Sequence, residues 1–266
     1  MSPTAILGMG VMGEALLSGL VRSGVSPNQI VIADRRAERV FEITKKYGVT
    51  SDTSAGAAAK AETIVLVVKP QDMGGLLEEI APHIKPSTLV VSLAAGITTD
   101  FLQSRLPAGT PVVRVMPNTP ALVDKGMAAI SAGSHCDDAH LERAEKLFQS
   151  TSKVIRLDEK HQDAVTAISG SGPAYIFYVV EAMIEAGVLL GLPRKVSTEL
   201  TVQTLLGAAT MLAETGEHPT LLRENVTSPA GTAVAALRQL DDHKVRAAFL
   251  SAMEAARNRS RELAQG

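Results

Sequence analysis

A glycine-rich turn near the start of the chain constrains the fold more than any other feature. Residues Ala5 to Gly13 read AILGMGVMG, so a short apolar run meets Gly8, Gly10 and Gly13 in the spacing G-x-G-x-x-G. An apolar stretch with helical spacing, residues 15–21, follows at once. A strand, a glycine turn and a helix in this order predict the first β-turn-α unit of a dinucleotide-binding fold.

Each of the three glycines has a separate expected role. Gly8 permits the tight turn, Gly10 removes a side chain where the backbone must approach a pyrophosphate, and Gly13 lets helix and strand pack closely. The helix N-terminus then offers unpaired N–H groups to the anion. We count Met12, which lies in the same turn, among the cofactor-binding residues.

Further apolar runs place this turn in a repeated β-α pattern. The run 29–33 ends at Asp34, about 20 residues beyond the last glycine, where this fold carries the residue that contacts the adenosine ribose. The runs 63–68 and 88–92 follow at the spacing of repeated βα units. An ordinary strand-to-helix turn explains the glycines alone, but not the glycines together with these runs.

The composition argues against several classes of function. With 45% hydrophobic residues and a net charge of −2, the chain has no overall charge bias toward nucleic acid or membranes. Aromatic residues make up 3% and tryptophan is absent, so stacking platforms for single-stranded nucleic acid are not expected. No His, Cys and Asp cluster has metal-ligand spacing, and the lone Cys136 is expected to be a bystander in a reducing compartment.

The cytoplasm is the location that the sequence leads us to expect. No secretory signal is evident, because glycines and Glu14 interrupt the opening apolar run. In addition, no stretch is expected to approach the length needed to span a bilayer.

The pattern of elements changes after residue 160. Before it, strand-like and helix-like segments alternate, which predicts an α/β fold with a Rossmann-type doubly wound sheet in residues 1–160. From His161 onward the strand signal disappears, and residues 161–266 are expected to form an all-α dimerisation domain. The helices predicted in this second domain are 173–190, 194–215, 229–240 and 243–263.

The predicted helices of the second domain are rich in small residues, as in the run 206–209, Leu-Gly-Ala-Ala. Small residues allow close backbone approach but bury little area per residue. We therefore expect a second subunit to supply the missing packing, giving a homodimer or a higher oligomer built from dimers.

Six further segments name a known family when they are taken together. Any one of them could be a chance loop, but six in this order could not. They are Val68-Lys69-Pro70, Ser92-Leu93-Ala94-Ala95-Gly96, Arg114-Val115-Met116-Pro117-Asn118-Thr119-Pro120, Ser169-Gly170-Ser171-Gly172-Pro173-Ala174-Tyr175, Gly216-Glu217-His218-Pro219 and Ser228-Pro229-Ala230-Gly231-Thr232. With these segments at matching separations, the chain resembles the pyrroline-5-carboxylate reductases from end to end. The resemblance implies the last step of proline synthesis, in which a nicotinamide cofactor transfers hydride to the C=N carbon of L-1-pyrroline-5-carboxylate.

The resemblance also implies a set of cofactor-binding residues beyond the glycine turn. In the family, the segment Val68, Lys69 and Pro70 lines the cofactor groove, and we favour this role for Lys69 over the alternative of a solvated strand end. Nearly bare backbone suits the approach of a flat nicotinamide ring, and Asn118 is expected to donate a hydrogen bond, unless it only caps its own turn. The residues with bare backbone are Ala94, Ala95 and Gly96.

Two signals disagree on which cofactor is used. Asp34 would accept a hydrogen bond from a free ribose 2′-hydroxyl and so favour NADH, whereas Arg35 and Arg36 would bind the 2′-phosphate of NADPH. The two arginines are alternatively the solvated start of the helix that the sequence predicts over residues 37–47. We expect NADPH, with NADH accepted.

For the substrate, the family places the five-membered ring against the segment 228–232, which here precedes a helix. Backbone N–H groups at that N-terminus and the Ser228 hydroxyl are expected to bind the carboxylate. A simple Ser-Pro helix cap has the same geometry. The candidate catalytic residues are Ser228, Thr232 and Asn225, and the candidate substrate-binding residues are Ser228, Ala230, Gly231, Thr232 and Ala233.

The substrate segment departs from the family pattern twice. Ala230 replaces the first glycine of the usual Ser-Pro-Gly-Gly, a mild change unless the position needs a positive φ. Ala233 stands where the family commonly carries a threonine that contacts the ring nitrogen. Three alternatives remain for that nitrogen: water serves it, Thr232 serves it, or the substrate is protonated before it binds.

Two rival functions are weaker on sequence grounds. A β-hydroxyacid dehydrogenase typically carries a lysine four residues after the last glycine of the motif that opens the long helix, and Ile176 stands there, counted from Gly172. A non-catalytic dinucleotide-binding paralogue stays open because of Ala233. His161 and His218 are expected to be structural or surface residues rather than an acid or a base.

Overall fold

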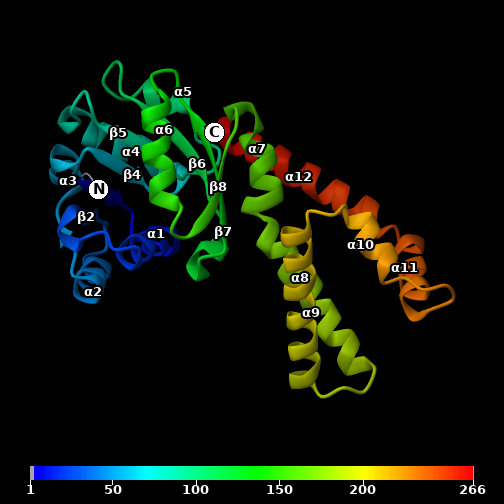
Figure 1. The fold of residues 1–266 in the computed structure, drawn as a ribbon. Helices are drawn as coiled ribbons and strands as arrows, with labels where there is room; N and C mark the ends of the chain where they lie inside the picture. Colours follow the sequence, from blue (N-terminus) through cyan, green and yellow to red (C-terminus); the bar gives the residue numbers. More distant parts are fainter. Residues whose placement is uncertain (1–2, 266) are drawn as a thin grey trace. The chain divides into compact units, whose positions relative to one another are not determined.

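The computed structural model describes residues 3–265, and its contacts divide the chain into two compact units (Figure 1). The first unit reaches Ser171 and also takes in the chain from Ala255 onward, while the second is Gly172–Glu254. The sequence pattern places the change after residue 160, so the α/β unit extends further than that pattern shows and includes the end of the last helix.

The first unit is built on one eight-stranded sheet with the order β3-β2-β1-β4-β5-β6-β7-β8. All neighbouring strands are parallel except β6 and β7. The strand order reverses between β1 and β4, and open α/β sheets bind ligands outside the carboxyl ends of strands at such a point. The strands are β1 (Thr4–Leu7), β2 (Ile30–Ala33), β3 (Thr50–Ser51), β4 (Thr63–Leu66), β5 (Leu89–Ser92), β6 (Val112–Met116), β7 (Gly126–Ala132) and β8 (Ser152–Arg156).

Helices cover both faces of this sheet, and each face has its own apolar core. On β1, Ile6 belongs to one core cluster, while Ala5 and Leu7 belong to the other, because successive side chains of a strand point to opposite faces. The first cluster draws on helices α1 (Val11–Arg22), α2 (Ala37–Tyr47) and α6 (Asp138–Phe148). The second draws on α3 (Ser54–Lys60), α4 (Pro70–Ile80) and α5 (Thr99–Gln103).

The second unit consists of helices, which are joined to the first unit by α7 (Gln162–Val165) and a π-helical turn, Thr166–Gly170. Helices α8 (Gly172–Leu189) and α9 (Arg194–Thr215) pack closely, since a Cβ on Gly187 would overlap the Ser197 hydroxyl. That hydroxyl donates a hydrogen bond to the Ile184 carbonyl at 2.8 Å. The remaining helices are α10 (Pro219–Asn225), α11 (Thr232–Asp242) and α12 (Val245–Gln265).

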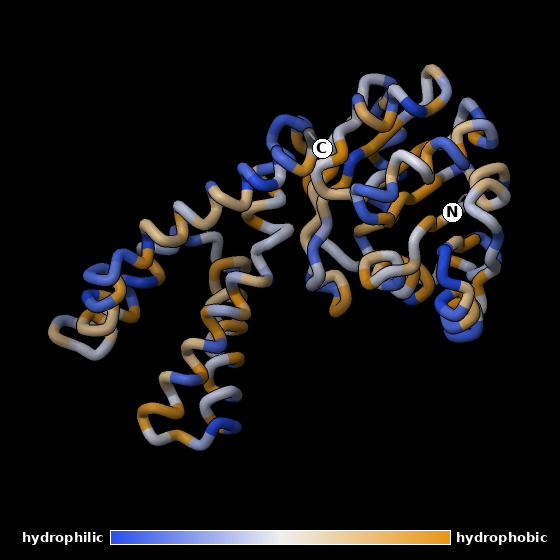
Figure 2. Tube along the Cα trace, turned by 180° about the vertical axis from the view of Figure 1, so that it is seen from behind, coloured by the Kyte–Doolittle hydropathy of each residue, from blue (hydrophilic) through white to orange (hydrophobic). Residues whose placement is uncertain are grey.

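Apolar side chains of α8 and α9 lie exposed on this chain. Helix α8 has no buried residue, and Phe177, Tyr178 and Leu200 are each more than half exposed. Orange, hydrophobic segments recur along both helices in Figure 2. This pattern agrees with the expectation that the helices alone do not close a core.

One expectation about length is wrong. The continuous helical stretch Glu159–Leu189 is long and apolar enough, by length and composition, to cross a membrane. The sequence analysis predicted a helix only over 173–190. In the structure, α7 and the π-helical turn extend this helix toward the N-terminus, which makes the apolar stretch longer. Core helices of soluble proteins meet the same two criteria, so the stretch by itself assigns no membrane.

Two helices begin and end where the sequence predicts, namely α2 at 37–47 and α9 at 194–215. The strand predicted at 63–68 is shorter, because β4 ends at Leu66. The helix predicted from Pro229 begins instead at Thr232, because Ala230 takes a left-handed conformation with a φ of 56° that a helix does not allow.

Candidate cofactor and substrate sites

A groove of about 480 Å³ lies at the carboxyl ends of β1, β2 and β4, beside the point where the strand order reverses. Seven of the predicted cofactor residues line it: Gly8, Gly10, Asp34, Arg35, Arg36, Val68 and Lys69. Sequence reasoning missed four further polar residues of its lining, Ser54, Gln71, Asp72 and Glu79.

The glycine turn at this groove has the geometry that the motif predicts. Gly8 has a φ of 104°, and a Cβ there would overlap the Val67 carbonyl. A Cβ on Gly13 would overlap the Gly8 carbonyl, so close packing of the helix on the turn requires this glycine. A Cβ on Gly10 would meet nothing within 4 Å, so this glycine leaves open space at the groove.

That open space adjoins the N-terminus of α1. The first helical hydrogen bond runs from the Glu14 N–H to the Gly10 carbonyl at 3.0 Å, so the three preceding N–H groups have no partner within the helix. Those donors belong to Val11, Met12 and Gly13. Unpaired donors, a helix dipole and free room together fit a pyrophosphate group.

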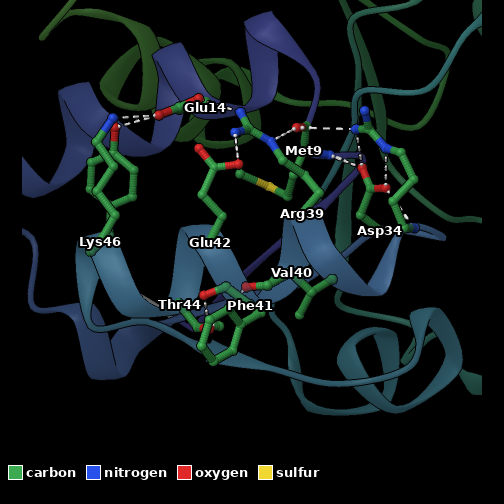
Figure 3. Close-up of polar contacts among 11 residues, drawn as sticks. Met9, Glu14, Asp34, Arg39, Val40, Phe41, Glu42, Thr44 and Lys46 are labelled. Carbon is green, nitrogen blue, oxygen red and sulfur yellow. Dashed lines mark hydrogen bonds and ion pairs between the residues drawn. The ribbon is translucent and has the colours of Figure 1, made fainter.

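Asp34 is fully engaged within the protein in this structure (Figure 3). Its Oδ2 accepts from the Met9 N–H at 2.7 Å, and the Arg36 side chain donates to both carboxylate oxygens, at 2.9 and 3.0 Å. Burial alone would raise the pKa of Asp34, but the hydrogen bonds from Arg36 and Met9 outweigh it and lower the pKa to about 2. The carboxylate therefore ties the glycine turn to the end of β2.

The two arginines that follow Asp34 extend to the solvent at the end of the groove beside β2. The Arg36 side chain is 62% exposed, although its Nε pairs with the Asp34 carboxylate at 2.9 Å. Arg35 is 75% exposed and pairs across the groove lining with Asp72 of α4, at 2.9 Å. An exposed pair of this kind contributes little stability, about 0–1 kcal/mol, so Arg35 is free to rearrange around an anion.

A second set of charges connects α2 to the first turn of α1, and sequence reasoning missed it. Arg39 donates from Nε to the Met9 carbonyl at 2.8 Å and pairs with Glu14 and Glu42 (Figure 3). Lys46 and Tyr47 also donate to Glu14, at 2.8 and 2.9 Å. Burial would raise the pKa of Glu14, but hydrogen bonds from Lys46, Arg39 and Tyr47 lower the pKa to about 2.

The remaining predicted cofactor residues lie at the ends of the next strands. Lys69 is exposed and precedes α4, which begins with Pro70 as its first residue. Gly96 has a φ of 77°, so the bend after β5 requires glycine, while Ala94 is buried and Ala95 half-buried beside it.

The Asn118 side chain has protein partners at both of its polar atoms. Its Oδ1 accepts from the Met127 N–H at 2.8 Å, and its Nδ2 donates to the Ser169 carbonyl at 3.1 Å. These bonds link the loop after β6 to β7 and to the π-helical turn. The donor role that the resemblance implies for Asn118 therefore has a structural competitor here.

The segment predicted to bind substrate forms a tight turn before α11. The Gly231 N–H donates to the Ser228 carbonyl at 3.1 Å, and Gly231 is the N-cap of α11. A Cβ on Gly231 would overlap the Ser228 hydroxyl, which therefore lies at the start of this helix. Thr232 is exposed and Ala233 half-buried in the first turn, and Asn225 ends the preceding helix α10.

Neither a metal nor a reactive thiol stands out in the part of the chain that the structure describes. No group of three or more His, Cys, Asp and Glu side chains within it has the arrangement of a metal site. Burial raises the pKa of the Cys136 thiol, whose Sγ donates to the Val112 carbonyl at 3.0 Å. His218 caps α10 by accepting from the Thr220 N–H at 3.3 Å, a structural role.

Comparison with known proteins decides among the functions that such a groove allows. Residues 159–263 match the family described as pyrroline-5-carboxylate reductase dimerisation, and residues 3–96 match NADP oxidoreductase coenzyme F420-dependent. A pyrroline-5-carboxylate reductase of Corynebacterium melassecola is 45% identical over 99% of both chains. The chain belongs to the pyrroline-5-carboxylate reductase family. The reductase of Pseudomonas aeruginosa is 41% identical over 98% of this chain and 96% of its own.

Solved structures of the family agree with this fold. The reductase of Coxiella burnetii superposes with a TM-score of 0.92 at 36% identity, over 98% of each chain. The reductase of Plasmodium falciparum, solved with NADP bound, gives a TM-score of 0.89 at 27% identity over 99% of this chain and 98% of its own. The expected fold class, a Rossmann-type unit followed by a helical one, is thus confirmed.

Proposed function

We propose that this chain reduces L-1-pyrroline-5-carboxylate to L-proline with a hydride from NADPH, as the last step of proline synthesis. The observation that carries the proposal is full-length membership of the reductase family, with 45% identity to a member over 99% of both chains. The glycine turn and its groove supply the matching chemistry.

The chain's own residues have distinct parts in this reaction. The N-terminus of α1, opened by Gly10, would hold the pyrophosphate, and the bare backbone from Ala94 to Gly96 would let the nicotinamide approach. The cofactor, when bound, supplies the hydride for the C=N carbon. The protein's contribution is to orient the two reactants and to exclude water.

NADPH is the proposed cofactor, with NADH accepted less well. Asp34 already accepts from Met9 and Arg36, so its oxygens are poorly available to a ribose 2′-hydroxyl. Arg36 and Arg35 instead present exposed guanidinium groups at the adenosine end of the groove. Arginine binds phosphate with charge-assisted hydrogen bonds that are stronger than neutral ones.

We propose that the N-terminus of α11 and the Ser228 hydroxyl bind the substrate carboxylate. In this helix Thr232 and Ala233 are consecutive, so their side chains project about 100° apart and one does not replace the other. This geometry favours the two alternatives in which water serves the ring nitrogen or the substrate binds already protonated. A protonated imine needs only a well-aimed hydride.

A homodimer is the proposed assembly, and the exposed apolar side chains of α8 and α9 are its proposed contact. The match of residues 159–263 to a dimerisation family supports this. It also gives the apolar stretch 159–189 a role outside a membrane, in keeping with a proposed cytoplasmic location. Light scattering of the purified protein measures its mass and so distinguishes a dimer from a higher oligomer built from dimers.

The direct test is an assay of the purified protein with pyrroline-5-carboxylate and NADPH, followed by loss of NADPH absorbance and by proline formation. We expect turnover, with a higher kcat/KM for NADPH than for NADH. Replacing Arg35 and Arg36 together by alanine should raise the KM for NADPH much more than that for NADH, because each lost contact to the 2′-phosphate costs about 1.5–3 kcal/mol. Binding of NADPH without any turnover would support the non-catalytic paralogue instead.

A further inference from the structure

The backbone of the glycine turn is fixed from several directions at one residue, Met9. Its side chain is fully buried in the apolar core between the sheet and helices α1, α2 and α6. Its N–H donates to Asp34 at 2.7 Å, and its carbonyl accepts from Arg39 at 2.8 Å and from Arg36 at 3.4 Å. Figure 3 shows Arg39 and Asp34 on either side of Met9.

We propose that Arg39 is a positioning residue for the pyrophosphate turn, and that it acts without touching the cofactor. Arg39 does not line the groove, whereas Gly10, joined to Met9 by one peptide bond, does. Because that peptide is planar, fixing the direction of the Met9 carbonyl also fixes the opposite direction of the Gly10 N–H. This inference rests on the proposed NADPH-binding function of the groove.

Arg39 has a second effect, because it also binds Glu14 in the first turn of α1. A carboxylate close to a helix N-terminus opposes the binding of a second anion there unless its charge is balanced. Arg39 supplies that balance together with Lys46, and the neutral Tyr47 hydroxyl adds a hydrogen bond to Glu14. Loss of Arg39 would therefore free the turn and leave Glu14 with less compensation.

The arrangement is rigid because the Arg39 side chain is only 18% exposed and uses all three of its nitrogens. Nε holds Met9, Nη2 holds Glu14, and Nη1 holds Glu42 at 2.7 Å. A planar guanidinium holds three acceptors in fixed directions, which the single ammonium of lysine cannot do. Lysine at this position is thus expected to restore the charge but not the geometry.

The test compares Arg39→Ala and Arg39→Lys with Glu42→Gln as the matched control, since Glu42 contacts Arg39 but not the turn. We expect Arg39→Ala to raise the Kd for NADPH and for NADH by the same factor, about tenfold, because both carry the pyrophosphate. Inhibition by adenosine 2′-monophosphate, which has no pyrophosphate, should be unchanged. Arg39→Lys should lie between the wild type and Arg39→Ala, and Glu42→Gln should match the wild type.

A readout without any cofactor accompanies these titrations. Hydrogen exchange of the peptide that spans the glycine turn should be faster in Arg39→Ala than in the wild type, and unchanged in Glu42→Gln. If Arg39→Ala does not fold, as judged by its thermal unfolding, Arg39→Met tests the same contact, because it keeps an aliphatic side chain of similar length but lacks the guanidinium, and it should give the same equal loss for both cofactors.

Three results would overturn the inference. Unchanged Kd values in Arg39→Ala would show that the turn needs no such support, and a loss confined to NADPH and adenosine 2′-monophosphate would make Arg39 a phosphate ligand. Equal exchange rates in the turn would remove the positioning role. Failure of the proposed function is distinguishable, because the wild type itself would then bind neither NADPH nor NADH.

Discussion

Ser260 donates a hydrogen bond from its hydroxyl to Asp163 at 2.8 Å, joining residues that are 97 positions apart. Ser260 is 3% exposed near the end of α12, and Asp163 lies in α7. Two arginines also face the Asp163 carboxylate, Arg114 of β6 at 3.8 Å and Arg261 at 3.7 Å. This cluster explains why the end of α12 belongs to the first unit.

Replacing Ser260 by alanine should therefore destabilise the first unit. A lost hydrogen bond to a carboxylate costs about 1.5–3 kcal/mol, which lowers the Tm by about 3–12 °C for a chain of this size. Thermal unfolding followed by circular dichroism measures the change. The control is Ser251→Ala on an exposed position of the same helix, and an equal change in both variants would contradict the role of the Asp163 contact.

Glu14 predicts a particular dependence of stability on acid pH. Its folded pKa is lowered from 4.5 to about 2, so its contribution is fully present above pH 4.5 and is lost as the pH falls toward 2. The Tm difference between the wild type and Glu14→Gln should be largest above pH 4.5 and close toward pH 2. A difference that stays constant over this range, measured by circular dichroism melts, would show that Glu14 stabilises through packing alone.

Ala230 is strained, and relief of that strain should stabilise the chain. Its φ of 56° lies in the left-handed region, which costs a residue with a Cβ about 1–2 kcal/mol. Glycine removes this cost but loses about 0.4–1 kcal/mol through the greater freedom of the unfolded chain. Ala230→Gly should therefore raise the free energy of unfolding by about 0.5–1 kcal/mol, measured by urea titration. A lower value in the variant would mean that the turn is not strained.

The local parts of the fold were predictable because they depend on neighbouring residues. The positions of Gly8 and Gly13 follow from the motif spacing alone, and the α9 limits follow from Gly-Leu-Pro before it and Gly216 after it. Long-range pairings have no such local signal. The Ser260 contact with Asp163, which moves the unit boundary, is one example.

In the candidate site, the sequence likewise predicted which residues lie there but not which groups they bind. Sequence reasoning placed Asp34 at the end of β2, where it lies, but the pattern does not reveal that Met9 and Arg36 occupy its carboxylate. It identified Asn118 but not the Met127 and Ser169 backbone groups that bind it. Arg39 was missed because its spacing from Glu14 becomes meaningful only once α1 and α2 are side by side.

The Ser228 hydroxyl should matter for the substrate and not for the cofactor. Ser228→Ala removes one hydrogen bond to the substrate carboxylate and should raise the KM for pyrroline-5-carboxylate by roughly tenfold, with the Kd for NADPH nearly unchanged. Thr227→Val is the matched control, because the Thr227 hydroxyl already donates to the Arg223 carbonyl at 2.6 Å. Equal rises in KM for the two variants would remove the special role of Ser228.

Ala233 tests whether the reaction needs a hydroxyl at the ring nitrogen. If the substrate binds already protonated or is served by water, Ala233→Thr should change kcat only modestly, and Thr232→Val should also have a small effect because its side chain projects elsewhere. A large loss in Thr232→Val would instead assign the nitrogen contact to that hydroxyl. A gain of about a hundredfold in Ala233→Thr, or roughly 2.7 kcal/mol of transition-state stabilisation, would indicate that the present sequence has given up reductase activity for cofactor or proline sensing.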